Sequence, residues 1–343
     1  MKNRLFVFLL LIIFFLSSCS RKQSFHYFKK TQLMMGTFVT ISVYDQDKAK
    51  KTITGAVDRA FRRIHALEGE TSYFIPDDPI WKLNHFSGKQ SVASDSNLVH
   101  LFREAEKISD WTAGGFDVTV GPLRRLWNFD STRTTLPDSE AVARLVPLVN
   151  YRDIEMTDHS LFLKKPGMQV DLGGIAKGFA VDEAMKVLKS FHITDAMVNA
   201  GGDFSAIASS LTAGKRKVWI RHPRKSNAFF GWFPMDSGCV ATSGDYQQFF
   251  IINGVRYHHI LDPKTGWPAR KCISVTIVAP TTMEADALAT GIFVLGPKAG
   301  IKVIEAHPGV EGVILFRKNA QELGYRISSG LQKKLTIVDA SIK

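Results

Sequence analysis

A carboxylate and a hydroxyl group stand four positions apart near the end of the chain, within the sequence EADALATG. They belong to Asp286 and Thr290, and residues four apart on a helix share one face. Hard oxygen donors of this kind suit Mg²⁺ better than zinc or copper, and Mg²⁺ usually binds few protein ligands together with substrate phosphates. Taken alone, the pair fits an ordinary helix start better, with Asp286 near the positive end of the helix dipole.

A second segment has the composition of a phosphate site. Residues 171–178 have the sequence DLGGIAKG, so Gly173 and Gly174 open a predicted helix and Lys177 lies in its first turn. Free N–H groups at a helix start attract phosphate, and glycine lets the backbone approach closely. The spacing is neither that of a Walker loop nor that of a Rossmann fingerprint. A tight strand-to-helix turn with a surface lysine explains the segment equally well by itself.

Further segments combine glycine or histidine with a carboxylate. Residues 199–203 have the sequence NAGGD, which alone is better explained as a plain turn after a buried strand. Residues 241–245 have the sequence ATSGD, and residues 257–266 (YHHILDPKTG) end in a turn by composition. His258 and His259 would point to opposite faces of a strand, so at most one faces a site. A lone histidine is more often structural, but one beside an Asp-bearing turn can act as a base near neutral pH.

The elements that would position these segments mix helices and strands without strict alternation, which predicts an α+β fold with largely antiparallel sheets and packed helices. Helical periodicity is found over residues 49–67, 96–112, 138–148, 175–190 and 282–295. Apolar alternation or short apolar runs predict strands over residues 34–44, 196–199, 217–221, 239–242, 249–253, 255–260, 274–279, 313–316 and 325–328. Residues 71–88 and 113–121 are expected to be loops. No repeat or linker divides the chain, so residues 33–340 are predicted to form one catalytic unit.

The N-terminus has the composition of an export signal. Lys2 and Arg4 precede an unbroken apolar run over residues 5–16, which is shorter than the about 20 residues that span a bilayer. The following Leu-Ser-Ser-Cys resembles a bacterial lipobox, in which Cys19 would carry a lipid. This predicts a signal peptide over residues 1–18 and a lipidated basic tether over residues 19–32, a two-part membrane anchor. The alternative is an ordinary signal with a chance cysteine.

The charge of the chain suits an anionic partner. The formal net charge is +12, and the basic residues are scattered rather than gathered in one run. This pattern argues against nucleic acid and fits an anionic dinucleotide or an acidic membrane partner. Of three cysteines, only Cys239 and Cys272 lie beyond the predicted signal and lipidated tether, and free thiols are favoured over a disulfide.

Taken in order, these motifs resemble the ApbE family of FAD:protein FMN transferases. The resemblance extends over residues 33–296, most of the mature chain. The matching segments are residues 35–37 (MGT), 115–123 (GFDVTVGPL), 171–178, 199–203, 241–246, 259–266 and 286–291. It implies a T-fold-like catalytic unit that binds FAD as a substrate together with Mg²⁺.

The resemblance also implies roles for individual residues. Asp286 and Thr290 would be side-chain ligands of Mg²⁺, Ala176 would add its backbone carbonyl, and His259 would be the catalytic histidine. The FAD pocket would be formed by Met35, Ser72, Tyr73, Gly115, Asp117, Gly173, Gly174, Lys177, Asn199 and Asp245. The loop after Ser72 departs from the family pattern, so either Tyr73 or Phe74 would supply its aromatic contact. Arg124 and Trp127 are further pocket candidates, although either could be plain packing.

The implied reaction moves FMN from FAD to a Thr or Ser hydroxyl of an acceptor protein and releases AMP. The implied acceptor is a flavoprotein subunit of a membrane redox complex. The expected location is the periplasmic face of the inner membrane, with the outer membrane left open. Two alternatives remain from the sequence, namely an Mg²⁺-dependent FAD pyrophosphatase and a non-catalytic flavin-binding lipoprotein.

Overall fold

The computed structural model describes residues 26–45, 48–129, 133–210, 212–319 and 322–342. The predicted signal peptide and lipidated Cys19 therefore lie outside the described residues. Of the predicted tether, residues 26–32 lie in the first strand of the fold. None of the helices in the described ranges combines the length and the hydropathy needed to cross a membrane.

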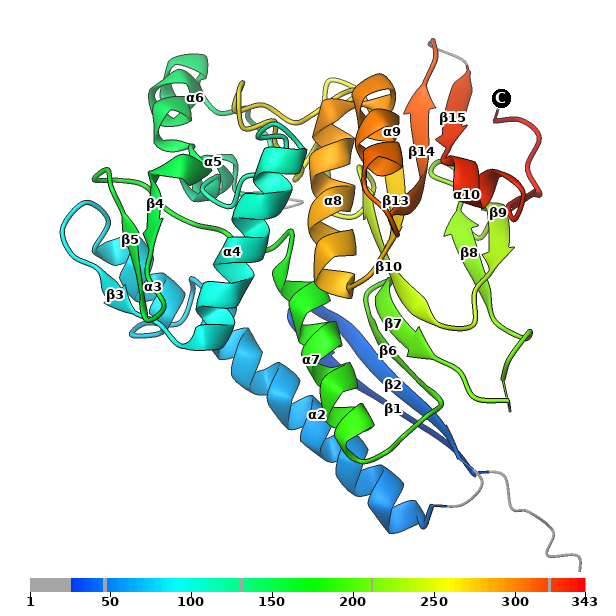
Figure 1. The fold of residues 1–343 in the computed structure, drawn as a ribbon. Helices are drawn as coiled ribbons and strands as arrows, with labels where there is room; N and C mark the ends of the chain where they lie inside the picture. Colours follow the sequence, from blue (N-terminus) through cyan, green and yellow to red (C-terminus); the bar gives the residue numbers. More distant parts are fainter. Residues whose placement is uncertain (1–25, 46–47, 130–132, 211, 320–321, 343) are drawn as a thin grey trace, which may run out of the picture.

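One large sheet organises the molecule (Figure 1), and each neighbouring pair of its strands is antiparallel. Its eight strands, in spatial order, are β1 (His26–Met34), β2 (Thr37–Asp45), β6 (Ala196–Ala200), β7 (Asp203–Ile207), β10 (Gly238–Gly244), β13 (Ser274–Ala279), β14 (Glu311–Arg317) and β15 (Leu323–Ile327). The mixed, largely antiparallel α+β fold predicted from the sequence is confirmed.

Four helices pack on one face of this sheet: α2 (Lys50–Thr71), α7 (Ala176–Ser190), α8 (Thr282–Leu295) and α9 (Pro297–Ala306). The buried positions of α2 recur at the predicted helical spacing, from Ile53 to Leu67. Helix α8 is buried nearly all round, because it packs on β10 and β13 as well as on α7, α9 and α4. Of its polar residues, Asp286 is therefore buried and Thr290 is half-buried.

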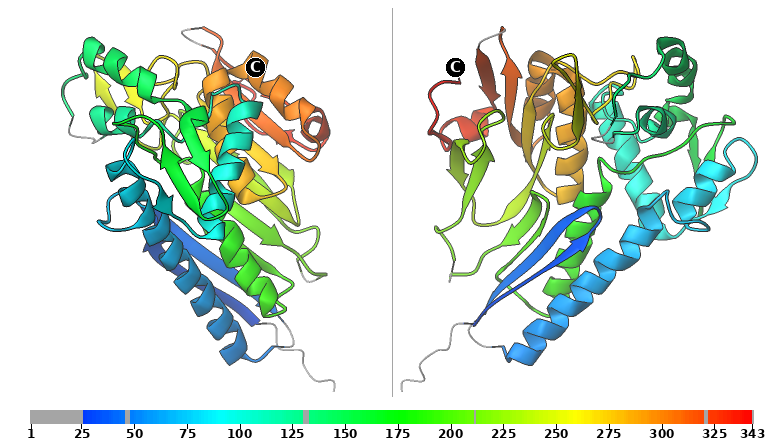
Figure 2. Two further views of the ribbon diagram at one scale, coloured as in Figure 1. Left: turned by 60° about the vertical axis from the view of Figure 1, so that its left-hand side comes forward. Right: turned by 180° about the vertical axis from the view of Figure 1, so that it is seen from behind.

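Part of the other face of the sheet, around β10 and β14, is covered by a smaller sheet. Strands β8 (Lys217–Arg221), β9 (Phe229–Pro234) and β16 (Thr336–Ile337) form this sheet, and α10 (Ser329–Gln332) lies close to it (Figures 1 and 2). Val218, Phe230 and Phe233 from this layer pack against Val240 and Leu315 of the large sheet. A second apolar core thus forms on the side opposite to the helices.

A mainly helical region lies beside α8 and comes from the chain between β2 and β6 (Figure 1). Its elements are α3 (Pro79–His85), β3 (Val92–Ala93), α4 (Ser96–Trp111), α5 (Gly121–Trp127), α6 (Ser139–Leu145), two 3₁₀ turns at Val146–Leu148 and Tyr151–Asp153, β4 (Ile154–Met156) and β5 (Ser160–Leu163). The hairpin of β11 (Phe249–Ile252) and β12 (Val255–His258) packs on α5. Trp127 is fully buried there and donates a 2.7 Å hydrogen bond to the carbonyl of Gly266.

Three of the predicted segments take a different form in the structure. Helix α3 interrupts the loop expected over residues 71–88, because Pro79 is tolerated in the first turn of a helix. The helix expected over residues 138–148 ends at Leu145 and continues as a 3₁₀ turn at Pro147. The strand expected over residues 34–44 is part of a hairpin, because Met35 and Gly36 take positive φ values of 51° and 69° and reverse the chain.

Candidate active site

Helices α7 and α8 are joined at their first turns by buried carboxylates. Asp182 of α7 accepts hydrogen bonds from the backbone N–H groups of Thr282 (2.9 Å) and Met283 (2.8 Å) at the start of α8. In return, Asp286 of α8 accepts one from the N–H of Gly178 at the start of α7 (3.1 Å). Each helix thus satisfies unpaired N–H groups of the other. This mutual capping fixes the position of Asp286 relative to the glycine turn that precedes α7.

Lys177 lies between two buried carboxylates. Its Nζ is 2.5 Å from Oδ2 of Asp203 and 3.2 Å from Oδ2 of Asp286. Although burial lowers the pKa of Lys177, the two carboxylates outweigh it and raise that pKa above its usual value. Burial raises the pKa of Asp286 to about 6, and Asp203 adds to this while Lys177 opposes it. The ammonium group of Lys177 therefore provides a positive charge next to the carboxylate of Asp286.

The turn formed by Gly173 and Gly174 lies against Thr290. Thr290 follows Asp286 by one turn of α8. A Cβ atom placed on Gly174 would lie 3.3 Å from Oγ1 of Thr290, so the backbone and the hydroxyl are neighbours. The same Oγ1 is 3.1 Å from the hydroxyl of Ser243 at the end of β10. Gly115 approaches α8 equally closely, since a Cβ on it would be 2.8 Å from the carbonyl of Gly291. The structure thus brings Asp286, Thr290 and Gly174 together at one place, which we call the proposed centre.

The oxygen donors of this centre fit Mg²⁺. Asp286, Thr290 and Ser243 offer a carboxylate and two hydroxyls, which are hard ligands, and Ala176 begins α7 next to Lys177. Within the described ranges, no group of three or more His, Cys, Asp or Glu side chains is arranged as a metal site.

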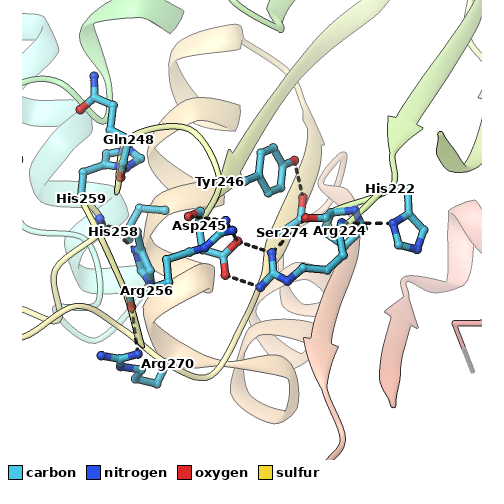
Figure 3. Close-up of polar contacts among 12 residues, drawn as sticks. His222, Arg224, Asp245, Tyr246, Gln248, Arg256, His258, His259, Arg270 and Ser274 are labelled. Atoms are coloured by element: carbon cyan, nitrogen blue, oxygen red, sulfur yellow. Dashed lines mark hydrogen bonds and ion pairs between the residues drawn. The ribbon is translucent and has the colours of Figure 1, made fainter. Parts of the chain in front are cut away.

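His258 and His259 occupy different environments, as expected for adjacent strand residues. His258 is buried and its Nε2 lies 2.7 Å from the carbonyl of Ala269, which gives it a structural position. His259 is half-buried, and both its N–H and its Nδ1 lie near the carbonyl of Gln248, at 3.0 and 3.3 Å (Figure 3). Burial lowers the pKa of His259 to about 3, and Arg124 acts in the same direction. Burial therefore favours the neutral form of the imidazole.

Arg124 of α5 connects the histidine to the glycine turn. Its Nε is 3.2 Å from Oδ2 of Asp171, while its Nη1 is 3.5 Å from the carbonyl oxygen of His259. Asp171 in turn accepts a 2.7 Å hydrogen bond from the N–H of Gly173. Burial raises the pKa of Tyr73, and Asp171 adds to this, so the tyrosine lies at the same side of the site.

Other predicted site residues have structural partners. Asp117 is buried and accepts hydrogen bonds from the N–H and hydroxyl of Thr119 (2.8 and 2.6 Å) and from the N–H of Tyr151 (3.0 Å). Asn199 accepts a 3.0 Å bond from the N–H of Gly202, and Ser72 accepts one from that of Phe74 at 3.2 Å.

Met35 and Asp245 lie further from the central contacts. Met35 is at the tip of the β1–β2 hairpin and donates its N–H to Glu68 of α2. Asp245 pairs with Arg224 through both carboxylate oxygens, at 2.7 and 2.5 Å (Figure 3). Among the described residues, no hydrogen bond or ion pair joins either residue to Lys177, Asp286 or Thr290.

Sequence reasoning missed two residues of the centre, Asp203 and Ser243. Both stand inside motifs that the sequence analysis recognises, at residues 199–203 and 241–245. Asp203 also accepts a 3.1 Å bond from the N–H of Thr242, which joins β7 to β10 beneath Lys177. The sequence signal for Asp203 was that its carboxylate directly follows Gly201 and Gly202 at the end of a predicted strand.

Comparisons with known proteins agree with this geometry. The model of the ApbE family matches residues 35–314. A FAD:protein FMN transferase of Treponema pallidum is 30% identical over 340 residues, which cover 94% of this chain and 92% of that protein. A protein of the same description from Klebsiella pneumoniae is 31% identical over 281 residues, or 79% of each chain.

Solved structures are similar over nearly their whole length. The ApbE protein of Thermotoga maritima superposes with a TM-score of 0.80 at 32% identity, covering 90% of this chain and 99% of that one. The flavin transferase ApbE of Vibrio cholerae gives a TM-score of 0.80 at 27% identity, covering 91% of this chain and all of that one.

Proposed function

The chain belongs to the ApbE family, and we propose on that basis that it is a Mg²⁺-dependent FAD:protein FMN transferase that moves FMN from FAD to a Thr or Ser hydroxyl of an acceptor protein and releases AMP. One observation carries the proposal: the backbone of Gly174 lies against Thr290, with Asp286 and Lys177 one helical turn away. A diphosphate and a hard cation could meet at this point.

The start of α7 would hold the diphosphate of FAD. Ile175, the residue before this helix, forms no side-chain cap, and Asp286 takes up only the N–H of Gly178, so the positive end of the helix dipole faces the glycine turn. The absence of side chains at Gly173 and Gly174 permits close approach of the substrate. Lys177 adds a positive charge beside the turn, and Asp203 keeps that charge in place.

Asp286 and Thr290 would hold Mg²⁺ through their side chains, with the carbonyl of Ala176 as a third protein ligand. When bound there, the ion would neutralise the diphosphate and stabilise AMP as the leaving group. The remaining demand on the protein is to position the two reactants, which is the main requirement in phosphoryl transfer.

His259 would remove the proton of the acceptor. The hydroxyl oxygen forms a bond to the phosphorus of the FMN half, and the bond from that phosphorus to the bridging oxygen breaks. AMP leaves with the electron pair, and the hydroxyl proton passes to the neutral imidazole. The negative charge of bound FAD would raise the pKa of His259 from about 3 towards a more effective value, since opposite charges favour the protonated form.

The test is a mixing experiment with purified protein, FAD, MgCl₂ and candidate periplasmic acceptors, read by in-gel flavin fluorescence. We expect a covalently fluorescent acceptor and an equal amount of AMP. His259→Ala should lower the transfer rate by about 10²–10⁴-fold, whereas His100→Ala, an exposed change on α4, should not alter it.

The products separate this function from its alternatives. Free FMN with no labelled acceptor would identify a pyrophosphatase, and bound but unreacted FAD would identify a flavin-binding lipoprotein. Full transfer activity in His259→Ala would remove the role given to that residue.

We further propose that the enzyme acts at the periplasmic face of the inner membrane, attached through a lipid on Cys19, and that its acceptor is a flavoprotein subunit of a membrane redox complex. The Leu-Ser-Ser-Cys sequence and the basic residues after it support the anchor. Labelling of growing cells with radioactive palmitate should mark the wild-type chain and not Cys19→Ser. Label in the Cys19→Ser variant would contradict the lipid anchor. Sedimentation of the wild-type chain with outer membranes would place the enzyme there and not at the inner membrane.

A further inference from the structure

A basic cavity outside the proposed centre has no part in the reaction described above. It has a volume of about 510 Å³ and lies between the β8–β9 loop and the β11–β12 hairpin. Its cationic lining residues are Arg221, Arg224, Lys225 and Arg256, and its aromatic lining residues are Phe229, Tyr246 and Phe249. We call it the Arg221 cavity.

The cavity carries more positive than negative charge. Arg224 and Arg256 share one carboxylate, that of Asp245, at 2.5 and 3.7 Å. Lys225 is neutralised by Asp339 at 2.7 Å. Arg221 is exposed and forms no ion pair with any residue in the described ranges. Three guanidinium groups therefore line the cavity while one carboxylate pairs with two of them, which leaves an excess of positive charge for an anionic ligand.

The wall of the cavity adjoins the proposed catalytic histidine. Phe249 lies opposite His258 in the β11–β12 pairing. The residue before it, Gln248, accepts the backbone N–H of His259 at 3.0 Å. Figure 3 shows Arg256 between His259 at the left and Arg224 at the right. A chain segment in the cavity would thus end close to His259.

We propose that the Arg221 cavity binds an acidic segment of the acceptor protein and thereby brings the acceptor hydroxyl to His259. This inference rests on the proposed transferase function, because only a protein acceptor must reach both places. Carboxylates of the segment would pair with Arg221 and with the guanidinium groups around Asp245, and such charge-assisted pairs give register as well as affinity. The aromatic rings would pack against the apolar parts of the segment.

The experiment measures peptide binding without FAD or Mg²⁺. Two fluorescein-labelled peptides, each with one central Thr, carry either aspartates or asparagines at the flanking positions. Fluorescence anisotropy at about 50 mM NaCl should show at least a tenfold preference for the aspartate peptide, which should shrink at about 300 mM because salt screens exposed charges. Arg221→Glu should reduce the preference about tenfold, and Arg221→Gln should reduce it less.

Arg62→Glu is the matched control, since it makes the same change of charge at an exposed arginine of α2. It should keep the preference of the wild type. Unchanged melting temperatures in all three variants would show that folding is not involved.

Equal binding of the two peptides, or an unchanged preference in Arg221→Glu, overturns the proposal. Weaker FAD binding in Arg221→Glu assigns the cavity to the nucleotide instead. If the protein binds phosphatidylglycerol vesicles through Arg221 and shows no preference between the two peptides, the Arg221 cavity is a lipid site. Peptide binding is measured without FMN transfer, so the two proposals can fail separately. A chain that does not transfer FMN could still prefer the aspartate peptide, and a chain that transfers FMN could lack that preference.

Discussion

At the scale of single residues, Lys177 has the most consequential position. Its ammonium group compensates Asp203 and Asp286, which are only 4% and 3% exposed. Two carboxylates buried side by side repel each other unless a cation accompanies them. The lysine therefore stabilises the fold at the point where the substrate and its metal would bind. Stability and ion binding should be coupled through this residue.

Lys177→Met tests that coupling. The substitution keeps the length of the side chain but removes the charge, and leaving buried charges unpaired costs about 3–5 kcal/mol. We expect a lower melting temperature and a larger rise of that temperature on adding MgCl₂ than in the wild type, because the ion would replace the lost charge. Differential scanning fluorimetry measures both. An equal Mg²⁺ shift in the two proteins would contradict the coupling.

His258 gives a pH dependence of stability whose sign follows from its burial. Burial lowers the pKa of His258 to about 4 from its usual value of about 6.5. As pH falls from 6.5 to 4, the unfolded chain binds this proton and the folded protein does not, so stability is lost over that window. The loss reaches about 3 kcal/mol for a shift of this size.

His258→Gln can keep a hydrogen bond to Ala269 without titrating. Urea denaturation at pH 7, 5.5 and 4 should show a weaker fall in the free energy of unfolding for this variant than for the wild type. Identical slopes in both proteins would show that His258 is not the source.

At the scale of elements, the contact between α7 and α8 decides where the site can form. A Cβ atom on Gly178 would lie 2.3 Å from the carbonyl oxygen of Thr282, which is a backbone atom and cannot move aside alone. The two helices therefore approach through a glycine, and the mutual caps of Asp182 and Asp286 form only at this separation.

Gly178→Ala should push the helices apart and break these caps. We expect a loss of about 1–3 kcal/mol of stability, together with weaker Mg²⁺ dependence of FAD cleavage. Gly55→Ala is the matched control, because no atom lies within 4 Å of the added carbon in the middle of α2. It should raise stability by about 0.5–1 kcal/mol. Chemical denaturation compares the two, and a neutral Gly178→Ala would contradict the role of close packing.

The elements also show what the sequence could predict. The periodicity of α2, α4, α7 and α8 predicts these helices because one or more faces are buried. It could not predict α3 or α5, which are one to two turns long and begin with prolines, so their apolar positions show no period. The juxtaposition of Gly174 with Thr290 followed from motif resemblance. The bridge of Lys177 between two carboxylates did not, because it depends on how β7, α7 and α8 meet in space.

At the scale of the whole molecule, the large sheet begins at an edge strand, β1, that protects β2. Val39, Ile41 and Val43 of β2 are fully buried, and β1 pairs with β2 along its whole length. All described contacts of the proposed centre come from residues after this strand. The segment before His26 should therefore be dispensable for folding and catalysis in solution.

Two truncations test this expectation. A chain starting at residue 26 should keep the melting temperature and the FAD-cleavage rate of the full chain. A chain starting at residue 35 lacks β1, which exposes the edge of β2, so it should be markedly less stable and more prone to aggregate. Scanning calorimetry and light scattering measure these outcomes. A loss of activity in the first chain would mean that the N-terminal segment contributes to the site.

The length of the β1–β2 hairpin sets a limit on geometry at the bilayer. Its nine residues span about 30 Å, at about 3.3 Å per residue, from His26 to the tip at Met35. With the proposed lipid on Cys19, residues 20–25 could add at most about 20 Å. The hairpin tip could then rise no more than about 50 Å above the headgroups. The reach of the proposed centre is this limit plus the distance from the hairpin tip to His259, so the lipid would act as a tether of fixed maximum length for the acceptor hydroxyl.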